Sequence, residues 1–326
     1  MKERNISIDI LKFLAVLLIT NSHMELLYGK YSILATGGTI GNALFFFCSG
    51  FTLFMKPITS IKNFPNWYKR RINRIYPTVL AIAIIKCSLF DINLNIIDII
   101  LNGGGWFVSC IMIYYVFIYL IGLYLRERIN LIIILVSLAS CLWFFSIERT
   151  FPFDIYYYKD SGYLDWLIYF NFMLLGAKIG TLNIEENGKS AKNLILSLLG
   201  ILVFYTIYVS GVKIEKIEFI EILSFIPLLF TVYYLYKWGN GKKARKLYTN
   251  RVGYFIIRFI GGLCLEIYLI QSCIFTDKLN SIFPLNLLII FCAIVIMAFI
   301  TRILARLISQ TFKEAPYDWK KIINMY

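Results

Sequence analysis

Charged residues are scarce in this 326-residue sequence: Asp, Glu, Lys and Arg together make up 16% of it, against about 25% in an ordinary soluble domain. Hydrophobic residues fill 59% of the chain, and its mean hydropathy is +0.71. A chain with so little polar surface cannot cover its apolar residues in water. The composition therefore excludes a water-soluble globule and indicates a multi-span membrane protein.

Acidic residues are scarcer still. The sequence has 19 Asp and Glu but 33 Lys and Arg, so its net charge is +14. A basic protein can bind nucleic acid when its charge lies on one solvated face. Here the basic residues fall in short clusters between apolar runs. We therefore expect membrane lipid around the chain and no nucleic acid among its partners.

Histidine is nearly absent, with His23 the single example, and none of the seven cysteines belongs to a CxxC pair. Such a sequence lacks a His/Cys metal-binding set, so no metal is expected. The cysteines lie within apolar stretches, where we expect them to be small buried hydrophobic residues. They are Cys48, Cys87, Cys110, Cys141, Cys264, Cys273 and Cys292.

Long apolar runs dominate the chain, and a transmembrane helix needs about 20 mainly apolar residues. The ten candidate segments are 7–27, 37–55, 72–90, 106–125, 129–147, 163–182, 193–211, 219–237, 253–275 and 284–307. The loops are too short for a soluble domain and no internal repeat is visible, so the sequence predicts one all-α domain over residues 1–326. The first segment starts like a secretory signal but lacks a small-residue cleavage site, so we expect it to be retained as a span.

The positions of Lys and Arg predict the orientation, because cytoplasmic loops carry an excess of positive charge. With ten spans and a cytoplasmic N-terminus, 25 of these residues fall on the inner side and six in outer loops. Lys12 and Lys86 remain within spans. Both termini are therefore predicted to be cytoplasmic.

Four ionisable residues, Asp9, Lys12, His23 and Glu25, lie in the first segment, where such groups usually mark a functional site. At about 100° per residue, Lys12 and His23 share one helix face roughly 16 Å apart along the axis. Asp9 precedes Lys12 by one turn and can neutralise it. His23 suits a general base or nucleophile, because imidazole takes up a proton near neutral pH. The alternatives are a polar packing residue for His23 and an ordinary interfacial pair for Asp9 and Lys12.

Two further pairs of residues are suited to ligand binding. Ser49 and Gly50 in the second segment let a ligand approach closely, although packing of small residues between helices explains them equally well. Arg71 and Arg74 follow at one helical turn from each other and can grip phosphates through two-pronged hydrogen bonds. Plain positive-inside charge is the alternative for these arginines.

In this order the motifs resemble the bacterial membrane acyltransferase family 3. The family's first span carries a basic residue, ten further residues and then His, which matches Lys12 and His23 with Asp9 ahead of them. Its FFxxSGF segment matches the Phe-rich stretch that ends in Ser49-Gly50-Phe51, and its RxxR matches Arg71 and Arg74. Looser matches follow at Trp106-Phe107-Val108 and Ile267-Tyr268-Leu269-Ile270.

The resemblance implies a transmembrane O-acyltransferase of the bacterial cytoplasmic (inner) membrane. Such an enzyme moves an acyl group, most often acetyl, from cytoplasmic acyl-CoA to a hydroxyl of a surface polysaccharide or a lipid-linked sugar. The implied catalytic residues are His23 and Asp9. The residues implied for acetyl-CoA are Lys12, Ser49, Gly50, Arg71 and Arg74, and those for the acceptor are Asn42, Trp106, Glu266, Tyr268 and Gln271.

The sequence also departs from the family. Gln271 stands where many relatives have His, which makes a mechanism with two imidazoles untenable, and the extracytoplasmic domain of some relatives is missing, so a stand-alone form is expected. The alternative function is a transporter or flippase for a glycan or acyl intermediate. Such proteins typically have broken helices and internal repeats, and the sequence shows neither. The acceptor, the acyl chain and the oligomeric state stay open.

Overall fold

The computed structural model describes residues 5–90, 92, 95–101, 103–157, 161–182 and 190–325, and all regular elements in these ranges are helices. The all-α prediction is therefore confirmed for this part of the chain. Lys2, Arg4, Lys159 and Lys189, which enter the charge count above, lie outside the described residues.

Six helical stretches of the described chain are long and apolar enough to cross a membrane. They are Ile61–Leu89, Gly105–Tyr124, Arg126–Ser146, Ser190–Lys213, Glu215–Gly239 and Leu285–Thr311. Two bent pairs raise the number to at most eight: Ile6–Ser22 with Glu25–Leu34, and Arg251–Gly262 with Cys264–Cys273.

The other two expected spans are the helices α3 (Gly38–Phe54) and α9 (Leu164–Gly180), each of 17 residues. At 1.5 Å per residue they are about 26 Å long, shorter than a hydrocarbon core of about 30 Å. Helices thus occupy all ten predicted segments, but the count of ten spans is not confirmed. The cytoplasmic location of the termini stays a prediction.

The first predicted span is not one straight helix. It consists of α1 (Ile6–Ser22) and a second stretch, Glu25–Leu34, at 64° to it. At the break, the backbone N–H of His23 bonds to Thr20 O at 3.2 Å, a tightened last turn. The Asn21 side-chain amide then donates to Leu34 O at 2.8 Å and to Thr36 O at 2.9 Å. These hydrogen bonds stabilise the bend between the two helices.

The chain divides into two compact units. The first unit comprises Met1–Lys12, Asn42–Thr59 and Phe117–Tyr254, and the second comprises Phe13–Gly41, Ser60–Val116 and Phe255–Tyr326. The helices α1, α3, α6 (Gly105–Tyr124) and α13 (Arg251–Gly262) each run from one unit into the other.

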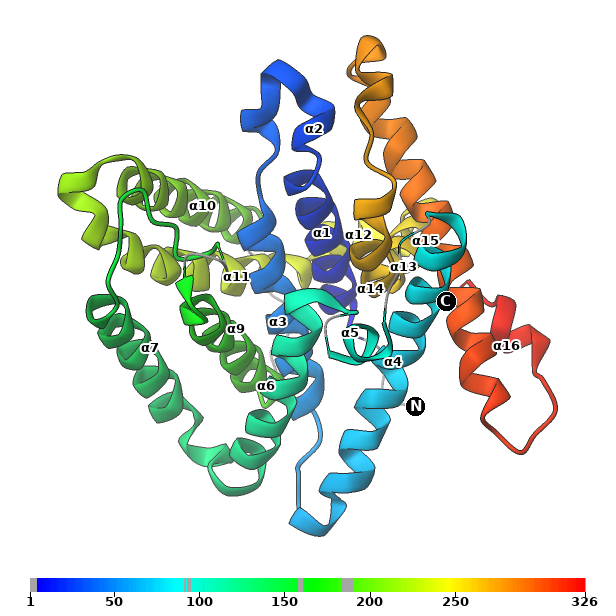
Figure 1. Cartoon of the computed structure of the whole chain (residues 1–326). Coiled ribbons are helices and arrows are strands. Elements are labelled where there is room, and N and C mark those ends of the chain that lie inside the picture. The colour runs from blue at the N-terminus through cyan, green and yellow to red at the C-terminus, as the bar shows by residue number, and fades with distance from the viewer. Residues whose placement is uncertain are drawn as a thin grey trace. The chain divides into compact units, whose positions relative to one another are not determined.

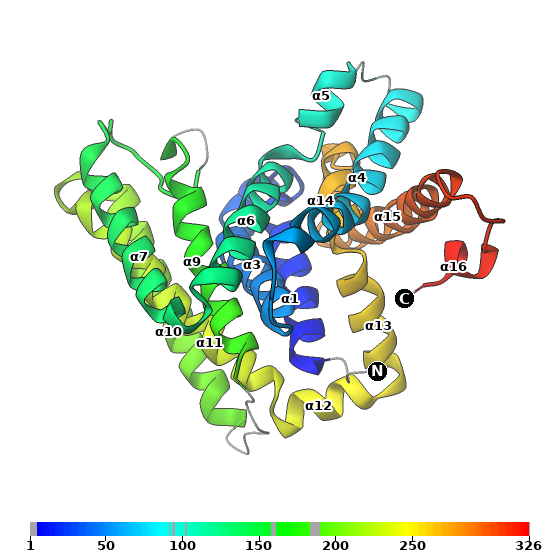
Figure 2. The ribbon, with the colours of Figure 1, turned by 90° about the horizontal axis from the view of Figure 1, so that it is seen from below.

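In the first unit, α7 (Ile129–Ser146) packs on α9, and α10 (Ser190–Lys213) packs on α11 (Phe225–Gly239). Both pairs lie side by side in Figure 1 and in Figure 2. On α10, a Cβ at Gly200 would lie 2.4 Å from Thr231 Oγ1, so only glycine allows this approach. Small residues at helix contacts are the usual way for membrane helices to pack closely.

The contact between α3 and α9 is closer still. A Cβ at Gly50 would lie 1.8 Å from the Met173 carbonyl oxygen, and one at Gly176 would lie 2.0 Å from that of Phe47. The two backbones therefore touch, and the glycine on each helix leaves room for the other.

In the second unit, α4 (Phe64–Leu89) packs along α15 (Leu285–Thr311), and α14 (Cys264–Ile270) contacts both (Figure 1). Asn286 near the start of α15 donates to Leu27 O at 2.9 Å and so connects α15 to the short helix Glu25–Tyr28. Shorter helices complete the fold: α2 (Glu25–Tyr28), α5 (Ile96–Leu101), α12 (Lys242–Thr249), α16 (Trp319–Ile323) and the 3-10 helix η5 (Gln271–Cys273).

The cysteines only partly match their prediction. Cys48 and Cys110 are buried, whereas Cys87 and Cys292 are exposed. The prediction of burial is therefore wrong for Cys87 and Cys292. Both of these residues lie on long apolar helices, α4 and α15, where burial within the protein is not needed to remove a side chain from water.

Candidate functional site

His23 lies at the first helix break, directly after the last residue of α1. Its side chain is exposed and makes no hydrogen bond or ion pair with the described residues. The helix face predicted to join Lys12 to His23 therefore ends one residue short, because α1 stops at Ser22. An exposed imidazole whose nitrogens have no partner among the described residues can accept a proton from an incoming hydroxyl.

Asp9 lies on α1 within the first unit and is 2% exposed. Its Oδ2 accepts a hydrogen bond from the Tyr248 hydroxyl of α12 at 2.8 Å. Lys12 is half-buried and makes no ion pair with the described residues. The pairing of Asp9 with Lys12 that the spacing predicts is therefore not formed, and Tyr248 holds the carboxylate instead.

The residues predicted on α3 also belong to the first unit. The Asn42 amide nitrogen lies 3.5 Å from the Tyr169 hydroxyl, and its buried Oδ1 has no hydrogen-bond partner within the described chain. Beside Gly50, the space expected for a closely approaching ligand is filled by the Met173 carbonyl of α9. This contact supports the packing alternative for Gly50. Ser49 is half-buried, and its role stays a prediction.

Arg71 on α4 is enclosed by aromatic rings of the second unit. Its guanidinium carbon lies 4.7 Å from the centroid of the Trp67 ring and 6.0 Å from that of Tyr115. These two rings meet edge to face at 6.0 Å and 88°. Cation–π contacts of this kind hold a guanidinium in place without using its N–H donors.

The Arg71 donor Nε is buried and has no hydrogen-bond partner in the described structure. An unsatisfied buried donor on a charged group is costly, so the position suits an anionic ligand. Arg74 lies one turn further along α4 and is exposed. The predicted spacing of Arg71 and Arg74 on one helix is confirmed.

The start of α6 meets α14 in the second unit. The Phe107 and Tyr268 ring centroids are 5.4 Å apart, and a Cβ at Gly105 would lie 3.6 Å from the Tyr268 hydroxyl. Trp106 is half-buried, with its ring edge to face with Phe107 at 6.0 Å. The structure thus brings the loosely matched Trp106 segment close to Tyr268, 160 positions away in the sequence.

Glu266 in the first turn of α14 is bound by Arg302 of α15. Arg302 donates through Nη2 to Oε2 at 2.8 Å and through Nε to Oε1 at 3.3 Å. Arg302 Nη2 also donates to the Gly262 carbonyl at the end of α13. Both carboxylate oxygens are therefore occupied, and the arginine connects the two helices on either side of the second break.

Gln271 follows α14 directly, in η5, and is 3% exposed. Its Oε1 is buried without a hydrogen-bond partner in the described chain. A buried orphan acceptor is rare in proteins. The side chain is therefore available to a donor group of a substrate.

The predicted site residues fall into two sets. The first unit holds Asp9, Lys12, Asn42, Ser49 and Gly50, and the second holds His23, Arg71, Arg74, Trp106, Glu266, Tyr268 and Gln271.

Sequence reasoning missed the partners of these residues. Trp67 precedes Arg71 by four residues on the same helix, a spacing that signals contact. Arg302 was counted as an orientation charge, although an arginine in so apolar a helix signals a buried partner. Tyr248, the partner of Asp9, has no comparable signal in the sequence.

Comparison with known proteins identifies the family. The family model Acyl_transf_3, described as an acyltransferase domain, matches residues 5–306. Neither the curated proteins nor the solved structures give a significant match. Because the family model covers nearly the whole chain, this protein is an acyltransferase and belongs to acyltransferase family 3.

Proposed function

We propose that this acyltransferase moves an acyl group, acetyl in the simplest case, from acetyl-CoA to a hydroxyl of a surface glycan or a lipid-linked sugar in the bacterial inner membrane. The observation that carries the proposal is Arg71, fixed between Trp67 and Tyr115 with an unpartnered Nε. Coenzyme A is polyanionic, and Arg71 with the exposed Arg74 supplies a two-arginine phosphate site. The motifs also imply Lys12 and Ser49 for the donor, whereas Gly50 packs against the Met173 carbonyl.

The chemistry assigned to His23 is proton transfer. As general base it takes the proton of the acceptor hydroxyl while the oxygen attacks the thioester carbonyl. A C–O ester bond forms, the C–S bond breaks, and the proton passes to the departing thiolate of coenzyme A. In the second route His23 attacks the thioester first and carries the acyl group before the hydroxyl takes it. Asp9, held by Tyr248, is the other proposed catalytic group.

The acceptor is assigned to groups that suit a sugar. Trp106 and Tyr268 offer aromatic surface for a sugar ring, and the unpartnered oxygens of Gln271 and Asn42 accept hydrogen bonds from hydroxyls. Glu266 has both oxygens bound to Arg302, which favours a positioning role over direct contact with the acceptor.

A glycan or acyl-intermediate transporter remains the second candidate, because the structure contains two helix pairs bent by 64° and 56°. Broken helices that carry polar residues are typical of transporters. His23 lies at the first break and Glu266 three residues after the second. A transporter moves its substrate without consuming acetyl-CoA, which separates the two functions.

The test uses purified protein, radiolabelled acetyl-CoA and candidate glycans. Arg71→Ala should raise the KM for acetyl-CoA about 10- to 100-fold, since a hydrogen bond to a charged group is worth roughly 1.5–3 kcal/mol. The adjacent Arg70→Ala is the matched control, because Arg70 is exposed and lies outside the ring pair. Well-folded wild-type protein without transfer or thioester hydrolysis would refute the enzymatic proposal.

The same assay examines the base. His23→Ala should lower kcat by about 10²- to 10⁴-fold, whereas Glu25→Gln, on the neighbouring exposed position of α2, should not. Full activity of His23→Ala would place the base elsewhere. If His23 carries the acyl group, label stays on wild-type protein when the acceptor is omitted and is missing from His23→Ala.

A further inference from the structure

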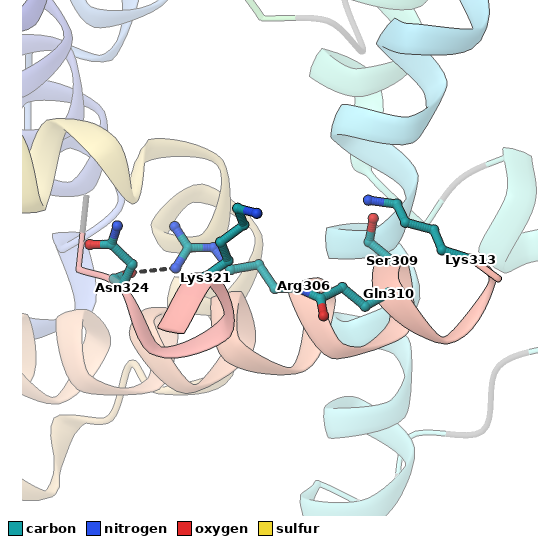
Figure 3. Close-up of a pocket in the computed structure, with 6 residues that line it drawn as sticks. All are labelled: Arg306, Ser309, Gln310, Lys313, Lys321 and Asn324. Carbon is teal, nitrogen blue, oxygen red and sulfur yellow. Dashed lines mark hydrogen bonds between the residues drawn. The ribbon is translucent and has the colours of Figure 1, made fainter. Parts of the chain in front are cut away.

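A cavity of about 300 Å³ lies at the end of α15, between this helix and the C-terminal segment that contains α16. Figure 3 shows the side chains that line it: Arg306, Ser309, Gln310, Lys313, Lys321 and Asn324. Three of the six are cationic and none is acidic. The function proposed above uses none of these residues.

Side-chain hydrogen bonds hold the cavity in shape. Arg306 donates through Nη1 to the carbonyls of Ile322, at 3.1 Å, and Asn324. Gln310 Oε1 accepts from the backbone N–H of Asp318 at 2.8 Å. The C-terminal segment is thereby fixed against the last two turns of α15, and the Arg306 guanidinium is already in position before a ligand binds.

One acidic residue lies close to the cavity and reduces its charge. Asp318 forms an ion pair with Lys321 at 2.7 Å, and the pKa of Asp318 lies below its usual value because the side chain and the backbone N–H of Lys321 donate hydrogen bonds to it. Asp318 is therefore charged at neutral pH. Arg306, Lys313 and Lys321 together still outweigh it by two positive charges, so the cavity suits an anion.

The position along α15 indicates where this anion comes from. The helix has 27 residues, about 40 Å, whereas about 20 residues span a hydrocarbon core. Counted from Leu285, the core ends near Leu304, and the cavity residues Arg306, Ser309 and Gln310 follow in the next two turns. On this count they fall at the depth of lipid headgroups, whichever side of the membrane this end faces.

Exposed aromatic side chains are close in sequence to the residues that line the cavity. Phe312 is 83% exposed and Trp319 is 59% exposed, and the Trp319 ring lies 5.8 Å from that of Tyr317. Aromatic residues of this kind gather at the membrane–water interface. Basic pockets beside transmembrane helices bind anionic headgroups.

We propose that this cavity binds the phosphate group of an anionic phospholipid. Lys313 and Lys321 contact the phosphate oxygens, Ser309 donates a hydrogen bond, and the flanking aromatic residues lie among the headgroups and upper acyl chains. The lipid anchors the C-terminal segment on α15. This inference does not rest on the acyl-transfer proposal.

The test measures lipid binding by native mass spectrometry of the delipidated full chain in neutral detergent, with dioleoylphosphatidylglycerol and dioleoylphosphatidylcholine as probes. Wild-type protein should prefer the anionic lipid. The double variant Lys313→Gln/Lys321→Gln should lose about 5- to 30-fold in affinity for it, since each lysine near an anionic headgroup contributes about 1 kcal/mol. Lys320→Gln, exposed on α16 and outside the cavity, is the matched control.

Two outcomes would overturn the proposal. Equal binding of both lipids by wild-type protein excludes the preference for an anionic lipid, because phosphatidylcholine carries the same phosphate with a compensating positive charge. A double variant that behaves like Lys320→Gln excludes Lys313 and Lys321 as phosphate contacts. A second arm adds inorganic phosphate or coenzyme A to the protein with bound phosphatidylglycerol. If coenzyme A displaces the lipid and the double variant raises the KM for acetyl-CoA, the cavity serves the donor and the lipid assignment is wrong.

Discussion

The ion pair of Glu266 with Arg302 permits the sharpest test of the site. The side chains are 8% and 12% exposed, respectively, and two hydrogen bonds join them. Arg302→Met leaves the Glu266 carboxylate buried without its partner. Breaking a buried pair in this way costs about 3–5 kcal/mol, because the remaining charge stays desolvated. At roughly 2–4 °C per kcal/mol, the apparent Tm should fall by about 6–20 °C.

A second substitution should reverse this loss. In Arg302→Met/Glu266→Gln the buried charge is gone, and replacing both members of a buried pair by neutral groups of similar volume is often neutral. The double variant should therefore recover most of the lost Tm, while the Gly262 carbonyl still lacks the Arg302 donor. The Tm of the wild type, of Arg302→Met and of the double variant is measured by thermal unfolding in detergent, followed by the fraction of protein that stays unaggregated. Arg251→Met, an exposed arginine of α13, is the control.

The kcat and the KM for the acceptor of the same proteins distinguish a positioning role of Glu266 from direct binding of the substrate. If the single variant loses activity only because the unpaired Glu266 charge disturbs the packing of α14, the double variant regains kcat together with its Tm. If Glu266 touches the acceptor, as the sequence predicts, the Tm returns but the KM for the acceptor stays raised. An Arg302→Met protein that melts like wild type would refute the reasoning, because the pair would then not hold α14 in place.

Three further substitutions have defined outcomes. Gly50→Ala should destabilise the protein by about 1–3 kcal/mol in thermal unfolding, since the new Cβ would lie 1.8 Å from Met173 O, and an unchanged Tm would show that α3 and α9 do not touch there. Gln271→Met should keep or raise the Tm, because it removes a buried oxygen that has no hydrogen-bond partner in the described chain. The kcat/KM for the acyl acceptor should fall, and an unchanged kcat/KM would exclude contact between Gln271 and the substrate. Tyr248→Phe should cost about 1.5–3 kcal/mol by removing the hydrogen bond to the Asp9 carboxylate, and amide exchange in α12 that matches wild type would contradict that contact.

The helices were predictable because each rests on a local signal. An apolar run of about 20 residues predicts a helix wherever it occurs, and all ten predicted segments are helical. The arginine pair of α4 was predictable for the same reason, since spacing within one helix determines which side chains are neighbours. The contacts of Asp9 and Glu266 were not predictable: their partners lie 239 and 36 positions away. Periodicity within a helix carries no information about such distances.

The helix breaks were missed because an average over 20 residues does not register a single turn. The hydropathy pattern continues through Leu263, and the polar stretch from Asn21 to Glu25 is too short to lower an average over 20 residues below that of a span. What ends the first helix is a set of hydrogen bonds from Asn21 to distant carbonyls, which the sequence pattern does not reveal.

Both breaks are stabilised by polar side chains. Irregular backbone at membrane depth is tolerated only where the exposed carbonyl groups find other partners. Asn21 donates to Leu34 O and Thr36 O beside the first break, and Arg302 donates to Gly262 O at the second. A side-chain donor therefore satisfies backbone acceptors at each bend. Because these bonds fix both bends, the backbone at His23 and the helix that carries Glu266 are held at defined positions, as the roles proposed for these two residues require.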